Sequence, residues 1–501
     1  MGYGALSGAA LFRGTGMKAF ILTVLLVSGA AAVSGCRDLG AGQDDPAASD
    51  GDTDTDGDTD TDGDMDSDSA GDGDTDRDSD GDGDTDTDGA GDTESGAGDS
   101  DPDLSDCFQG DVTVSNAADA EPVAPYRCIA GDLIITGKSL ETFDLPNLES
   151  VYGSVVVEDT EALTTLNGLR GLTSVTGDLG IGWSYEMDGT GVLRWPSSAV
   201  LKNVGLTSLE GLSQVRLVGG DLRVDNCPLI TSLSGLEGIT AVPADLRNGS
   251  LPSLTSLDGL QNVSEVGGDL HIYACPQLTT LSVLENIAEV GEDLIISGND
   301  GLSTLSGLEG VSVVGGDLVI SGNDGLAGAD GLGNVETVRG NVEFQDNSSL
   351  AGLEALSALT GVGGNFWLIG NDTMTRVGAL PMLTRIERDL RLEGNDALTN
   401  PGGLESLTFV DGYIYILANG SLSSLGGLEN LARVSGTVHI VNNPLLPACE
   451  ACALLAQFQS FSGRVDFKGN GPDTCPNECT DVYYRTESDD YPFPSCCTAL
   501  P

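Results

Sequence analysis

The sequence is poor in basic residues and in histidine. Its 501 residues include 21 Lys and Arg against 78 Asp and Glu, and the formal net charge is −57 with both histidines neutral. A chain this negative repels nucleic acid and anionic lipid headgroups, so neither is expected as a partner. Tryptophan is also scarce, with three residues in the chain.

Long apolar runs are almost absent, and the run Ala19–Val27 is too short to span a bilayer as a permanent helix. It follows Lys18 and precedes small residues and Val33-Ser34-Gly35-Cys36. This order resembles a bacterial lipoprotein signal peptide, in which the cysteine becomes the acylated first residue. An ordinary secretory signal is the alternative. We expect residues 1–35 to be removed and Cys36 to carry the lipid.

The segment 36–106 lacks a hydrophobic core composition. From residue 37 onward it holds 28 acidic and two basic residues among Gly, Thr and Ser. Self-repulsion and the shortage of apolar side chains predict a disordered, extended acidic linker.

The linker contains two short patterns of alternating Asp that end in Gly. They resemble calcium loops of thrombospondin type 3 repeats, but the twelfth-position Glu of an EF-hand and the spaced cysteines of true type 3 repeats are missing. A plain spacer that condenses cations is therefore favoured over ordered Ca²⁺ sites. The calcium ligands under the second interpretation are Asp52, Asp54, Asp56, Asp58, Asp60 and Asp62.

An internal repeat dominates the rest of the chain. GEDLIISGNDGL at residue 291 returns 24 residues later as GGDLVISGNDGL, and from Asp221 to Thr437 the motif recurs in nine steps of 24. Such regularity predicts a solenoid in which each repeat buries its apolar side against its neighbours. We expect about thirteen turns over residues 107–446, and a Cys-rich cap and tail over 447–501.

Within one repeat the apolar residues alternate first and then recur every third position. Leu294-x-Ile296 predicts a short strand, and the later positions lie among Gly, Ser and Thr, which disfavours helices. Asparagine recurs at one offset in seven consecutive repeats, which predicts a hydrogen-bonded ladder. The Asp before each strand is expected to cap turn N–H groups and not to be catalytic.

The repeat GGDLxIxxNxxLTSLxGLxxLxxV resembles the receptor L domain, which occurs in insulin and epidermal growth factor receptor ectodomains and in bacterial surface proteins. This resemblance implies a right-handed parallel β-helix over roughly Cys107–Asn470. The array is longer than one receptor module, and no furin-like Cys-rich region divides it. The leucine-rich repeat is the competing family, but its Asn-to-Leu spacing is shorter.

Cysteines are expected to act structurally, because export favours disulfides. Cys107 and Cys128 flank the first turn and should staple the N-terminal cap. Cys227 and Cys275 lie two repeats apart, roughly 9–10 Å, which is beyond disulfide reach, so we expect buried thiols. The C-terminal cysteines predict disulfides, with a zinc site as the alternative. The receptor L resemblance implies the pair Cys449–Cys475.

No catalytic constellation is found in the sequence. His271 and His439 are seven repeats apart, roughly 34 Å along the axis, and cannot share a substrate atom or a metal. Nucleophile elbows, phosphate loops and His-Glu-x-x-His motifs do not occur. We therefore expect a protein that is not an enzyme and that needs no cofactor, with a polysaccharide-acting β-helix as the least favoured alternative.

The candidate binding residues lie on the outward strand face and in one insertion. Aromatic and arginine side chains are typical of recognition surfaces, although β-propensity alone would also place some there. A 19-residue insertion between Asp178 and Asp221 holds the other two tryptophans. The predicted ligand-binding residues are Trp183, Trp195, Arg223, Arg247, His271, Trp367, Arg391, Tyr415 and His439.

These observations predict a lipid-anchored protein of the bacterial cell envelope that binds a glycan or protein ligand. The lipoprotein resemblance, with Arg37 after the cysteine, implies the outer membrane and surface exposure. A structural envelope protein is the second hypothesis.

Overall fold

The computed structural model describes residues 104–182, 186–187, 193–194, 203–459, 461 and 463–472. The chain divides into two units, Met1–Ser95 and Gly96–Pro501, and all described residues belong to the second. Several predicted site residues lie outside the described residues. They are Cys36, the six linker aspartates, Trp183, Trp195 and Cys475.

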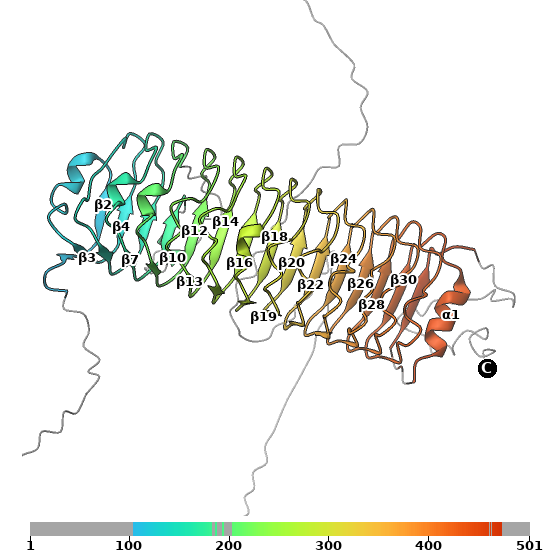
Figure 1. Cartoon of the computed structure of the whole chain (residues 1–501). Helices are drawn as coiled ribbons and strands as arrows, with labels where there is room; N and C mark the ends of the chain where they lie inside the picture. Colours follow the sequence, from blue (N-terminus) through green and yellow to red (C-terminus); the bar gives the residue numbers. More distant parts are fainter. Residues whose placement is uncertain are drawn as a thin grey trace, which may run out of the picture. The chain divides into compact units, whose positions relative to one another are not determined.

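The second unit is a parallel β-solenoid, as the sequence predicts (Figure 1). Each strand of the largest sheet pairs in parallel with the strand one turn later, as in Leu294↔Leu318. The sheet has fifteen strands. In order they are β2 (Val112–Val114), β4 (Leu133–Ile135), β6 (Val155–Val157), β8 (Leu179–Ile181), β12 (Leu222–Asp225), β14 (Leu246–Gly249), β16 (Leu270–Tyr273), β18 (Leu294–Ser297), β20 (Leu318–Ser321), β22 (Val342–Gln345), β24 (Phe366–Ile369), β26 (Leu390–Glu393), β28 (Ile414–Leu417), β30 (Val438–Val441) and β31 (Val465–Lys468).

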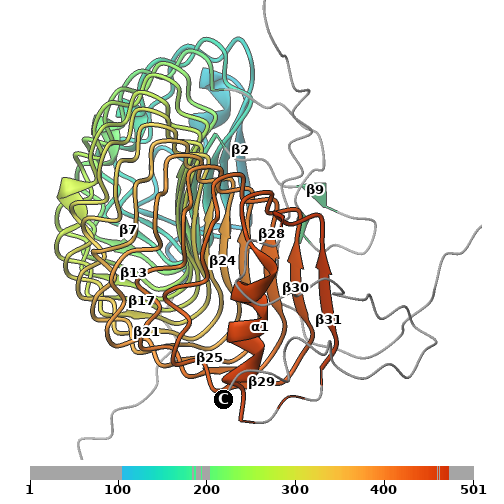
Figure 2. The ribbon, with the colours of Figure 1, turned by 90° about the vertical axis from the view of Figure 1, so that its right-hand side faces the viewer.

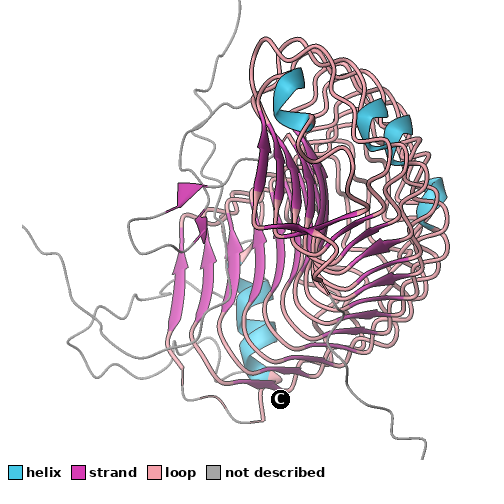
Figure 3. Ribbon diagram, turned by 90° about the vertical axis from the view of Figure 1, so that its left-hand side faces the viewer, coloured by secondary structure: helices cyan, strands magenta, loops and turns pink. Residues whose placement is uncertain are grey.

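Two sheets of short strands form a second side of the solenoid (Figure 3). The first contains β1 (Phe108–Gln109), β3 (Cys128–Ala130), β5 (Ser150–Val151), β7 (Ser174–Val175) and β11 (Leu217–Val218). The second contains β13 (Ala241–Val242), β15 (Glu265–Val266), β17 (Glu289–Val290), β19 (Val313–Val314), β21 (Thr337–Val338), β23 (Gly361–Val362), β25 (Arg385–Ile386), β27 (Phe409–Val410) and β29 (Arg433–Val434).

The remaining elements are few. A hairpin pairs β9 (Glu186–Met187) with β10 (Leu193–Arg194). The described 3₁₀ turns are η1 (Ala117–Ala120), η2 (Asn167–Leu169), η3 (Glu210–Leu212) and η4 (Ser282–Leu284). The α-helix, α1 (Ala448–Ala456), lies across the C-terminal end of the stack (Figure 2). None of the helices in the described ranges is long and apolar enough to cross a membrane.

The solenoid extends beyond the thirteen predicted repeats at both ends. β2 precedes the next strand of its sheet by 21 residues, from Val112 to Leu133, and β31 follows β30 by 27, from Val438 to Val465. The longer last spacing accommodates α1.

The core is a continuous aliphatic stack. Along a typical strand the first and third residues are buried, as Leu294 and Ile296 are, while the second and fourth are partly exposed. The apolar residues that recur every third position are buried as well, as Leu302, Leu305 and Leu308 show. Each turn covers the apolar surface of its neighbours, which explains why the repeat is regular.

An asparagine ladder runs through this core. The side-chain oxygen of Asn323 accepts the backbone N–H of Asn299 at 3.0 Å, and its amide nitrogen donates to the carbonyl of Ile296 at 2.9 Å. The same bonds recur turn after turn, so every amide is satisfied although it is fully buried or nearly so. The ladder comprises the seven predicted residues Asn299, Asn323, Asn347, Asn371, Asn395, Asn419 and Asn443, and also Asn470.

Candidate functional site

The outward side of the fifteen-stranded sheet, here called the outer face, carries most of the predicted ligand-binding residues. Parallel in-register pairing places the second residue of each strand directly beside the second residue of the next. We call this row the outer column. It consists of Arg223, Arg247, His271, Ile295, Val319, Glu343, Trp367, Arg391, Tyr415 and His439.

The C-terminal half of the outer column brings four predicted residues together. The guanidinium carbon of Arg391 lies 5.9 Å from the ring centroid of Trp367 and 5.8 Å from that of Tyr415. The Tyr415 and His439 rings stack at 5.0 Å with an interplanar angle of 2°. The side chains of Arg391 and His439 are 35% and 30% exposed, so the row is accessible to a ligand.

The stacking fixes how these rings meet solvent. The centroid spacing of Tyr415 and His439 is close to the separation of adjacent strands, about 4.8 Å. Their faces therefore cover one another along the sheet. Tyr413, 43% exposed, extends the stack at 5.9 Å from Tyr415. Such a row offers hydrogen bonds and positive charge more readily than an open aromatic platform.

Carboxylates flank Arg391 and His439 in the row. Arg391 forms an ion pair with Glu393 of the same strand. The Nδ1 atom of His439 lies 3.7 Å from a carboxylate oxygen of Asp466 on β31. Together these pairs orient the side chains that a ligand would contact.

The N-terminal half of the outer column is built differently. Arg223 Nη2 lies 2.5 Å from Asp221 and 3.1 Å from Asp245, and Arg247 Nη2 lies 2.9 Å from Asp245 and 2.7 Å from Asp269. The two arginine side chains are only 5% and 18% exposed. They are largely withdrawn from solvent and neutralise the aspartates beside them. The sequence pattern predicted one outward row, and the structure divides it into two parts.

A tyrosine spans three strands beside these arginines. Tyr273 on β16 donates its hydroxyl to Asp225 on β12 at 3.2 Å, across β14. The ring passes over Gly249, where an added Cβ would lie 2.1 Å from a Tyr273 ring carbon. This contact was not predicted from the sequence, where the glycine in a strand position was its available signal.

Burial controls the ionisation of this cluster. It raises the pKa of Asp225 to about 7, against opposing contributions from the Tyr273 hydrogen bond and the arginines. It also lowers the pKa of His271 to about 4, assisted by the positive charge of Arg247. The His271 ring packs on Tyr273 at 4.5 Å between centroids. The predicted His271 therefore belongs to the buried half.

The aspartates that precede the strands form a structural ladder. The Oδ1 atom of Asp293 accepts the backbone N–H of Asp317 at 2.7 Å, and the same bond recurs from Asp178 onward. Asn341 and Asn365 continue it in two turns. This geometry agrees with a capping role.

One acidic group has oxygens close enough to share a cation. One ligand atom from each of Asp245, Asp269 and Glu292 lies within 4.8 Å of the others. The first two already pair with Arg247. That guanidinium supplies the positive charge that the pair of aspartates requires.

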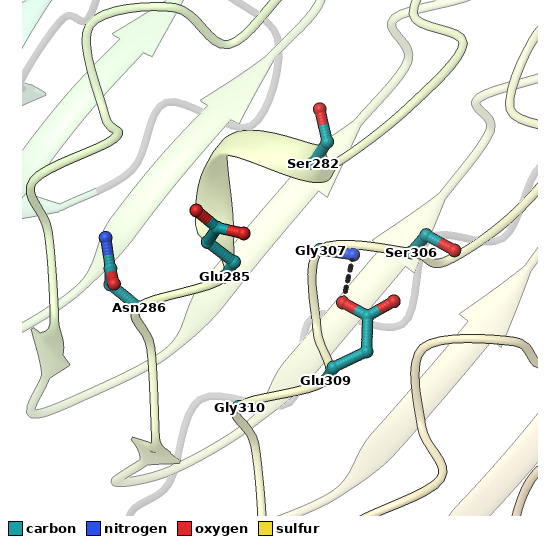
Figure 4. Close-up of a pocket in the computed structure, with 7 residues that line it drawn as sticks. All are labelled: Ser282, Glu285, Asn286, Ser306, Gly307, Glu309 and Gly310. Carbon is teal, nitrogen blue, oxygen red and sulfur yellow. Dashed lines mark hydrogen bonds between the residues drawn. The ribbon is translucent and has the colours of Figure 1, made fainter.

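A shallow polar groove lies between two neighbouring turns (Figure 4). Glu309 caps the backbone N–H of Gly307 at 2.6 Å, and Gly307 adopts a φ of +113°. One turn earlier Val283 occupies the equivalent position within η4. The groove is lined by Ser282, Glu285, Asn286, Ser306, Gly307, Glu309 and Gly310.

The cysteines behave as structural residues. Cys107 and Cys128 form the predicted disulfide. Cys227 and Cys275 are buried thiols whose pKa burial raises to about 12, so neither is a nucleophile at neutral pH. Cys449, the second residue of α1, is disulfide-bonded. The cysteine that it joins lies outside the described residues.

The described chain resumes at Asn203 after the 19-residue insertion. Asn203 accepts from the N–H and hydroxyl of Thr160 at 3.1 and 2.8 Å and donates to Val157 at 2.9 Å. These bonds match those of the asparagine ladder, so the turn keeps its usual anchor despite the insertion.

Comparison with known proteins adds no relative. The sequence matches no protein-family model. A search of curated proteins likewise finds no significant match.

Proposed function

We propose that this protein is a non-enzymatic recognition protein that binds an extracellular glycan or protein through the C-terminal half of its outer face. The observation that carries the proposal is the accessible row Trp367–Arg391–Tyr415–His439. It gathers aromatic and cationic side chains on a rigid sheet in a protein that otherwise has few of either. Rigid elements hold binding groups at fixed spacing, which reduces the entropy lost on binding.

The direct test is a screen of the full chain on glycan and peptide arrays, followed by two variants of the row. Arg391→Ala and Tyr415→Ala should each weaken binding of the identified ligand by at least about tenfold if the row forms a binding hot spot. Arg376→Ala is a matched control, because Arg376 is 60% exposed and pairs with Glu354 away from the outer column. Equal binding by all three variants would reject the row as the binding surface.

A structural role in the envelope is the second candidate. It is favoured by the same rings, because Tyr415 and His439 stack on each other and so stabilise the sheet without any ligand. Under this role the two row variants would lower the unfolding midpoint but would not change binding to any array.

The proposed placement is a lipid-anchored, surface-exposed protein of the outer membrane, as the segment ending at Cys36 suggests. We further propose that the repeat resembles the receptor L domain because the chain belongs to that family or has the same repeat architecture. Cys36→Ser should release the chain from the membrane fraction, and unchanged fractionation would reject the anchor.

A further inference from the structure

A carboxylate without a cationic partner occupies the middle of the outer column. Glu343 on β22 stands between Val319 and Trp367, which pair with it in register. No hydrogen bond or ion pair reaches its side chain within the described part of the chain. Burial, with Asp317 and Asp293 nearby, raises its pKa to about 7. By contrast, Glu393 on the same face pairs with Arg391.

Trp367 is positioned to bind a second cation. Arg391 lies over its ring from the β26 side, at 5.9 Å from the centroid. On the β22 side the neighbour is the Glu343 carboxylate and not a cation. The indole Nε1 atom is buried and has no hydrogen-bond acceptor. An aromatic ring beside a carboxylate is a favourable setting for an ammonium group, which gains both cation–π and ionic contacts.

We propose that Glu343 and Trp367 form a subsite for the side chain of a lysine on a basic protein partner. The subsite rests on the proposed recognition function and specifies the chemistry of one contact within it. A compact ammonium group fits a single carboxylate between adjacent turns, whereas the planar guanidinium of arginine is suited to two parallel bonds. The four-carbon lysine stem can pack over Val319 and the indole, which an amino sugar cannot reproduce.

The charge of the protein supports a basic partner. The net charge of −57 attracts cationic surfaces and accelerates their encounter. Locally, a bound ammonium would neutralise Glu343 and offset its repulsion with Asp317 and Asp293.

The test is a titration of the full chain with an end-capped peptide whose only charged group is one lysine. The reporter is the indole N–H signal of Trp367 in ¹⁵N NMR spectra, assigned with Trp367→Phe. Saturable movement of this signal is expected, and the same peptide with acetylated lysine should leave it unmoved. Glu343→Gln should weaken lysine binding by about tenfold or more. Glu354→Gln, a matched change at a carboxylate that pairs with Arg376 away from the outer column, should have little effect.

Each other outcome overturns the proposal. Equal response to the acetylated peptide, or unchanged affinity in Glu343→Gln, would show that the ammonium group is not recognised there. Stronger binding of glucosamine than of the lysine peptide would assign the subsite to amino sugars. Failure of the proposed recognition function can be told apart from failure of the lysine subsite. The first would appear as unchanged array binding by Arg391→Ala, and the second would appear in the lysine titration.

Discussion

The two halves of the outer face share one backbone register but use the same residue types in opposite ways. In the N-terminal half Arg223 and Arg247 are withdrawn among aspartates, whereas in the C-terminal half Arg391 lies between two rings and remains 35% exposed. The interior of the solenoid also differs between the N-terminal and the C-terminal turns. The asparagine ladder is continuous from Asn299 to Asn470, but Cys227, Leu251 and Cys275 occupy its column in the earlier turns. A repeat therefore fixes where a side chain points and not what it does there.

The largest expected difference between the halves is in the response to loss of an arginine. Arg223→Ala should lower the free energy of unfolding by about 3–5 kcal/mol, because it leaves Asp221 without its cation in a largely buried site, while Asp245 keeps Arg247. Arg391→Ala should cost below about 1 kcal/mol, since its ion pair is partly solvated. Urea unfolding followed by circular dichroism measures both. Equal losses would remove the distinction between the halves.

The next effect concerns the interior ladder. Asn371→Ala removes the acceptor of the Asn347 N–H and the donor to the Phe344 carbonyl, so two buried backbone groups lose their partners. We expect a loss of about 2–4 kcal/mol in unfolding free energy. Ser348→Ala serves as the control, because it removes an exposed hydroxyl one turn before Asn371, and it should change stability little. A loss no greater than that of the control would show that the ladder contributes nothing to stability.

A pH effect on stability should arise at Asp225 in the N-terminal half. The folded pKa of Asp225 is raised to about 7 from an ordinary value near 3.8, so the folded state retains its proton more readily. Stability from this group is fully present below about pH 4 and is lost as pH rises toward 7 and above. Asp225→Asn should abolish a loss on the order of 2 kcal/mol between pH 5 and 8. A wild-type unfolding midpoint that rises over this interval as much as that of the variant would contradict the assignment.

The smallest expected effect is a gain. Asn248 is fully buried between Val224 and Ile272, and neither of its side-chain polar atoms has a partner. Asn248→Val should raise the unfolding free energy by about 1–2 kcal/mol, because it removes two unpaired polar groups from an aliphatic row. Calorimetry would record a higher melting temperature. Asn371→Val provides the contrast. It should be destabilising, because the Asn371 side chain bonds to two buried backbone groups.

Much of this fold is readable from the sequence because each turn repeats one set of physical requirements. The 24-residue spacing, the Leu-x-Ile strands and the asparagine column all follow from stacking, and the structure has each of them. The thirteen predicted repeats leave out the first and last strands of the sheet, whose spacings from their neighbours are 21 and 27 residues.

The candidate site was less readable, since exposure depends on what packs above a strand. The pattern placed Arg223 and His271 in the outward row, and they are there, but their burial is a tertiary property. The reach of Tyr273 across Gly249 to Asp225 involves residues 48 positions apart and has no repeat signature. The stacking of Tyr415 on His439, in contrast, follows directly from the register.

The interrupted asparagine ladder has a mechanical consequence. Its bonds run along the stacking axis, so tension applied between the two ends of the solenoid loads the turns in series. The Asn299 amide still bonds to the Cys275 N–H and the Ile272 carbonyl one turn earlier, but no asparagine of this column joins the Cys227 turn to the Leu251 turn or the Leu251 turn to the Cys275 turn. These turns are expected to separate first in single-molecule pulling, and Leu251→Asn with its two cysteine neighbours also changed to Asn should raise the force of the first rupture. A solenoid with a weak segment near its middle can lengthen under load while its C-terminal face stays folded.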